Sequence, residues 1–66
     1  MDIAEEKSRI GIFIDRGNFH AAMNLSISAM NECRRNNDQG GTEEFLQLIH
    51  RIADIMTSLY GAPAND

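Results

Sequence analysis

Residues 9–18 of the chain read Arg-Ile-Gly-Ile-Phe-Ile-Asp-Arg-Gly-Asn, and this stretch decides the fold that the sequence predicts. Isoleucine and phenylalanine favour β-strands, and a short apolar run is typical of a strand that is buried on both faces. The run ends at Asp15, so the pattern predicts a strand at about residues 9–15. Because open α/β sheets bind ligands at the carboxyl ends of their strands, Asp15 is the first candidate for a functional site.

Two helices are predicted after this strand. Asn18 is a suitable N-cap, because its side-chain oxygen can accept a hydrogen bond from a free amide of the first helical turn. Apolar residues then recur every three or four positions and predict a helix at about residues 19–35. After a polar loop, Thr42 is the expected cap of a second helix at about residues 43–60, which Gly61 ends.

The apolar stripes of the two predicted helices are the candidate core. The first contains Phe19, Met23, Ile27, Met30 and Cys33, and the second contains Phe45, Leu48, Ile49, Ile52, Ile55, Met56 and Leu59. Cys33 and the methionines on these stripes are expected to fill space in that core rather than to perform chemistry. Residues 1–8 and 62–66 have no such stripe, and we expect them to form a flexible leader and a tail.

Length and charge limit the class of protein. A chain of 66 residues can form at most one small domain, and its single cysteine excludes an internal disulfide and fits a reducing compartment. The net charge of −4 argues against a basic nucleic-acid-binding surface, although a bound metal ion can supply positive charge locally. The absence of a long apolar run argues against a membrane span, and the acidic N-terminus is unlike a signal peptide. A cytoplasmic location is therefore expected.

The segment from Ile10 to Phe19, with Asp15 after the apolar run and Asn18 before the first helix, resembles the opening of NYN domains in the PIN-like nuclease superfamily. Arg16 departs from that pattern, because many members carry glycine directly after the aspartate. The resemblance implies an α/β fold, a Rossmann-like α/β/α sandwich with a parallel sheet. This chain would supply only its leading strand, helix and helix.

The resemblance also implies a function, the metal-dependent cleavage of RNA by an endoribonuclease. It makes Asp15 and Asn18 the candidate catalytic residues, with Asp15 as the ligand of Mg²⁺ or Mn²⁺ and Asn18 orienting the acid or a phosphate. Hard oxygen ligands of this kind suit Mg²⁺, which can activate water and stabilise charge on phosphorus. Arg16 could pair either with Asp15 or with a phosphate of RNA. Since one strand-end acid is too few, we expect the chain alone to be inactive.

The remaining polar candidates have simpler interpretations. Asp54 is expected on the solvent face of the second helix, and Glu32, Glu43 and Glu44 are expected to be helix-surface or cap charges. His20 is expected to be an exposed residue of the first helical turn, and His50 to lie beside the second stripe.

The strand leaves an open question, because a lone strand would have unpaired backbone groups. Either the chain is the leading piece of a larger α/β domain, or the strand pairs across a homo-oligomer. The alternative function is that of a small helical interaction protein, whose two apolar stripes form a homodimer or dock on a partner. This alternative follows from the amount of apolar surface on residues 45–59 in so short a chain.

Overall fold

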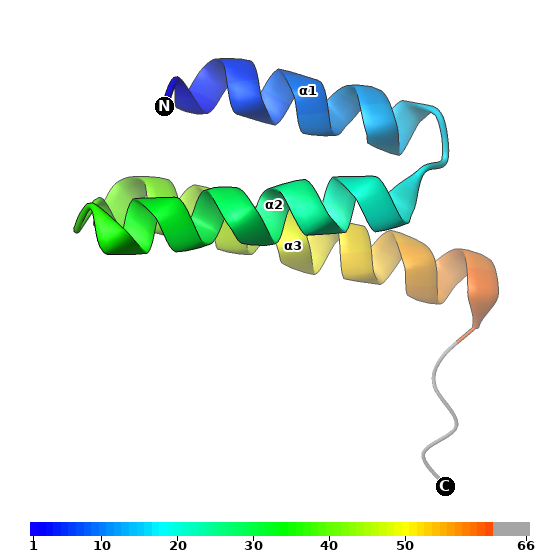
Figure 1. The fold of residues 1–66 in the computed structure, drawn as a ribbon. Coiled ribbons are helices and arrows are strands. Elements are labelled where there is room, and N and C mark those ends of the chain that lie inside the picture. Colours follow the sequence, from blue (N-terminus) through cyan, green and yellow to red (C-terminus); the bar gives the residue numbers. More distant parts are fainter. Residues whose placement is uncertain (62–66) are drawn as a thin grey trace, which may run out of the picture.

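The chain folds into three helices in the computed structural model, which describes residues 1–61. They are α1 (Ile3–Asp15), α2 (Phe19–Arg35) and α3 (Gln39–Tyr60). Consecutive helices run antiparallel, and α2 contacts both neighbours extensively, whereas α1 and α3 touch each other only sparingly (Figure 1). The predicted tail at residues 62–66 lies outside the described part.

The prediction of a strand at residues 9–15 is wrong, because this segment forms the second half of α1 and no strand occurs within residues 1–61. The expected α/β sandwich with a parallel sheet is wrong for the same reason. The resemblance to NYN and PIN-like nucleases is therefore not borne out, and the nuclease class that it implied loses its structural basis.

Residues 2–14 explain why α1 is helical. Asp2 caps the helix, and its Oδ1 accepts a hydrogen bond from the Glu5 amide at 3.2 Å. Ile3 and Ile14 occupy the same side of the helix as Ile10, which is fully buried. The apolar side of this helix begins at Ile3, within the segment expected to be a flexible leader. The run from Ile10 to Ile14 therefore contains only part of the helical pattern.

The other two helices differ little from the sequence-based expectation. α2 spans the expected residues, whereas α3 begins four residues before the expected start at 43, because Asp38 rather than Thr42 is its N-cap. Asp38 Oδ1 accepts from the Gly41 amide at 2.9 Å, and the Thr42 hydroxyl donates to the Asp38 carbonyl at 2.7 Å.

The core lies where α2 meets its two neighbours. Ile10 from α1, and Phe45 and Ile52 from α3, are fully buried, and each such side chain stabilises the fold by about 1.5–3 kcal/mol. The α2 residues between them are mostly small: Ala22, Ser26, Ala29 and Cys33. The buried Ser26 hydroxyl donates to the Ala22 carbonyl at 2.8 Å, so it does not remain unpaired. Small side chains on α2 thus allow both neighbouring helices to approach closely.

The connection between α1 and α2 is a compact Schellman turn. The Asn18 amide donates to the Phe13 carbonyl at 2.8 Å, and the Gly17 amide donates to the Ile14 carbonyl at 2.9 Å. Gly17 has a φ of 76°, in the left-handed region that favours glycine.

The connection between α2 and α3 repeats this pattern. The Asp38 amide donates to the Cys33 carbonyl at 2.8 Å, and the Asn37 amide donates to the Arg34 carbonyl at 3.1 Å. Asn37 takes the left-handed position with a φ of 58°. In both turns the last residue, Asn18 or Asp38, also caps the helix that follows.

The three helices make a flattened molecule, with extents of 38, 27 and 14 Å along its principal axes. None of the helices in the described part is both long and apolar enough to cross a membrane. Because the bundle is thin, α1 covers only part of the surface of the α2–α3 pair.

Candidate interaction surface

The three residues predicted to form a nuclease site lie together at the turn between α1 and α2. Asp15 is the last residue of α1, Arg16 follows it, and all three side chains are exposed. The Asn18 side-chain oxygen accepts from the Ala21 amide at 3.3 Å, so it has the capping role expected from the sequence. The roles of these residues in catalysis, Mg²⁺ or Mn²⁺ binding and RNA binding stay predictions.

The acidic and histidine side chains are spread over the surface. Within residues 1–61, no three His, Cys, Asp or Glu residues are grouped so that they could hold a metal ion. Asp54 is exposed on α3, as predicted, and His20 and His50 are exposed as well.

Cys33 is a core residue, as predicted. Its side chain is buried, and burial raises the pKa of the thiol, an effect to which the nearby carboxylates of Asp38 and Glu32 add. Each of these causes disfavours the thiolate, which is the nucleophilic form of cysteine. The thiol therefore packs in the core, where its neutral form is favoured.

One side of α3 lies against α1. Lys7 Nζ of α1 is 2.9 Å from Glu44 Oε1 of α3, and a shallow hollow beside this ion pair is lined by Lys7, Glu44, Gln47, Leu48 and Arg51. Leu48 and Ile55, on the same side of α3, pack against the core. These contacts identify the covered side of the α2–α3 pair.

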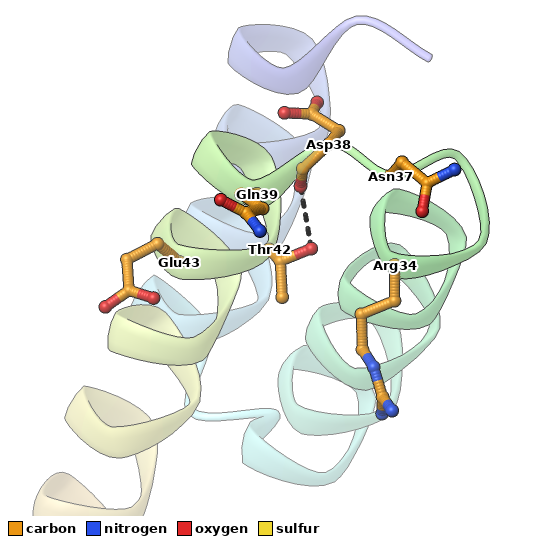
Figure 2. A pocket seen from close by; sticks show the side chains of 6 residues that line it. All are labelled: Arg34, Asn37, Asp38, Gln39, Thr42 and Glu43. Atoms are coloured by element: carbon orange, nitrogen blue, oxygen red, sulfur yellow. Dashed lines mark hydrogen bonds between the residues drawn. The ribbon is translucent and has the colours of Figure 1, made fainter.

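The other side of the pair is open. A hollow of about 420 Å³ lies near the turn between α2 and α3. Figure 2 shows the side chains that line it, with α1 behind α3. The hollow is lined by Arg34 of α2, by Thr42 and Glu43 of α3, and by Asn37, Asp38 and Gln39 between them. The Arg34 side chain extends along α2, away from the turn (Figure 2). Neither Arg34 nor Glu43 forms an ion pair within the part of the chain that the structure describes.

Apolar side chains continue from this hollow along both helices. Residues three or four apart share one side of a helix, so Met30, Ile27 and Met23 follow Arg34 on α2. Leu46, Ile49 and Ala53 follow Thr42 on α3 by the same rule. We call these six apolar residues the open face.

The open face contains side chains that the core does not use. Ile27 is 39% exposed, and Leu46 and Ile49 are half-buried but lie outside the cluster of side chains that packs against the core. Met23 and Met30, by contrast, contact the core at the edge of the face. Both helices of the pair thus keep partly exposed apolar side chains beside the core.

Sequence reasoning placed Ile27 and Ile49 in the core and omitted Leu46. The width of the apolar band on α2 is the sequence signal that could have distinguished such open-face residues from core residues. The small residues of α2, from Ala22 to Cys33, form one stripe, and its large residues Met23, Ile27 and Met30 form a second stripe beside it. A band of this width indicates more contacts than one neighbouring helix can make.

Comparison with known proteins gives no relative for this chain: no protein-family model, no curated protein and no solved structure matches it. The chain is a small helical protein.

Proposed function

We propose that this chain is a small helical interaction protein that binds a protein partner through the open face. The observation that carries the proposal is the position of Ile27, Leu46 and Ile49, which belong to the neighbouring helices α2 and α3 and lie outside the core. A contiguous apolar patch of this kind on a small protein marks an interaction site, whereas isolated exposed apolar residues are common everywhere.

The distribution of charge supports the same function. The centre of the open face carries no charged residue, while Arg34 and Glu43 stand at one end of it. Protein interfaces have this arrangement, with an apolar centre depleted of charge and a polar rim. Methionine, present at two positions of the face, adapts to partner surfaces more easily than branched residues do.

A photo-crosslinking amino acid at position 27 tests the proposal in cells that produce the protein. The matched control is position 12, because Ile12 is 50% exposed but lies on the outer side of α1. We expect a covalent adduct of discrete mass from position 27 and none from position 12. An additional Ile49→Glu substitution should abolish the adduct by placing a charge on the facing helix.

The opposite results are equally clear. Equal adducts from positions 12 and 27, or none from position 27 at any expression level, would overturn the proposed function. Far-ultraviolet circular dichroism of each variant checks that the helices persist, which matters most for Ile49→Glu because Ile49 is half-buried.

A further inference from the structure

We infer that the partner on the open face is a second copy of this chain, related by a two-fold axis that runs parallel to the helices. The inference rests on the proposed function and names its partner. With this axis, α2 of each copy lies on α3 of the other, and corresponding ends of the two copies meet. The surface of each copy is then self-complementary, as a two-fold interface requires.

The charges of the two helices favour this pairing. On the open side of the pair, α2 carries the cation Arg34 and α3 carries the anion Glu43. Placing α2 on the partner's α3 therefore brings opposite charges together. Placing α2 on α2 and α3 on α3 would bring like charges together, which costs affinity.

The position of Arg34 makes the pairing specific. Arg34 and Glu43 lie on opposite helices at the same end of the open face, and both line the hollow in Figure 2. The two-fold axis therefore places Arg34 of each copy next to Glu43 of the other, giving two equivalent ion pairs. Within one copy each of these side chains lacks an ion-pair partner among the described residues.

The size of the face suits a dimer. The 17 residues of α2 and 22 residues of α3 correspond to helices of about 25 and 33 Å, and two adjacent helices are about 20 Å wide. The resulting surface is of the same order as the roughly 800 Å² that each partner contributes to a standard interface. A dimer would also give this short chain additional buried apolar surface, which chains of this length commonly need.

Exchanging charges between Arg34 and Glu43 tests the arrangement. Arg34→Glu and Glu43→Arg should each weaken the dimer, raising its Kd about tenfold or more, because every substitution creates two repulsive pairs. An equimolar mixture of these two variants should form a heterodimer as tightly as the unmodified chain forms its dimer. In that heterodimer each Glu faces an Arg again.

Arg35→Glu is the matched control. Arg35 is the next residue on α2 and is exposed, but it does not line the hollow, so its reversal should leave the Kd within about threefold. Sedimentation equilibrium of the full chain and of each mixture gives the Kd values, and circular dichroism confirms that all variants remain helical.

Several results would overturn the inference. They are a monomer at about 0.3 mM, a dimer whose Kd ignores both reversals, or a mixture no tighter than its components. A monomer that still gives an adduct with a different protein from position 27 would leave the proposed function standing. A monomer without any adduct from that position would remove both.

Discussion

The two turns of this molecule have the same backbone but different side chains. Each uses the same pair of amide-to-carbonyl hydrogen bonds and one left-handed residue, and each ends in the cap of the next helix. The left-handed residue is Gly17 in the first turn and Asn37 in the second. The residue whose amide the cap binds is Ala21 in the first turn and Gly41 in the second.

The surroundings of the turns explain the difference. A Cβ atom at Gly41 would lie 2.7 Å from Cys33 Sγ and 2.9 Å from Ile3 Cδ1, because the start of α1 covers the second turn. A Cβ atom at Gly17 would meet no heavy atom within 4 Å, because the first turn is open. Hydrogen bonds thus define the path of the chain in both turns. The side chains that each turn can accept depend on whether a helix outside that turn, such as α1 at the second turn, packs against it.

The largest expected effect comes from making the second turn resemble the first by Gly41→Ala. The added methyl group would overlap with Cys33, Ile3 and the Asp38 carboxylate, so we expect a loss of about 2 kcal/mol in the free energy of unfolding. Urea denaturation followed by circular dichroism measures it.

The neighbouring glycine is the control for that substitution. A Cβ atom at Gly40 has only Asp38 Oδ1 nearby, at 3.7 Å, so Gly40→Ala should leave stability unchanged or raise it slightly. If Gly41→Ala proves as stable as Gly40→Ala, the second turn is not covered by α1 as described.

The next largest loss of stability is expected from substitutions at Gly17, which test backbone strain in the first turn without crowding. Gly17→Ala has space for its methyl group, but a φ of 76° is unfavourable for alanine, so we expect a loss of about 1.5 kcal/mol. Gly17→Asn should lose about half as much, since Asn37 adopts the same conformation in the second turn. Equal stability of Gly17→Ala and the unmodified chain in urea would contradict the left-handed assignment.

This comparison also shows what the sequence could and could not predict. Asn18 was identified as a cap from its chemistry alone. Gly17 follows a strand or a helix equally well, however, so it could not reveal which element came before it. Asn37 gave no signal of a left-handed turn, because asparagine occurs in many other loop conformations.

The first helix was missed because its determinants lie on both sides of the apolar run. Ile10 to Ile14 matches a strand by composition, whereas the helical alternative depends on Asp2 as a cap and on Ile3, which lies on the same side of the helix as Ile10. The open face was missed for a different reason. The wide apolar band on α2 indicates two stripes, but whether Ile27 or Ala22 faces the core depends on where α1 packs.

A smaller change in stability is expected from removing the N-cap that ends each turn. The Asp38 carboxylate binds the Gly41 amide at 2.9 Å in a partly buried position, whereas the Asn18 oxygen is 3.3 Å from the Ala21 amide in an exposed one. We expect Asp38→Ala to cost about 1 kcal/mol or more and Asn18→Ala somewhat less. Thermal unfolding of both variants ranks them, and Asp38→Asn, which keeps the hydrogen bond, should lose little. The reverse order would show that charge and burial do not distinguish the turns.

A small gain is expected from Asn37→Gly, which gives the second turn the left-handed residue of the first. Glycine adopts a φ of 58° without the steric penalty that asparagine has there, and this outweighs its greater freedom in the unfolded chain. We expect the free energy of unfolding to rise by about 0.5 kcal/mol, as measured by urea denaturation with several repeats. Loss of stability would mean that the Asn37 side chain itself stabilises the second turn. The two turns would then have the same backbone conformation for different physical reasons.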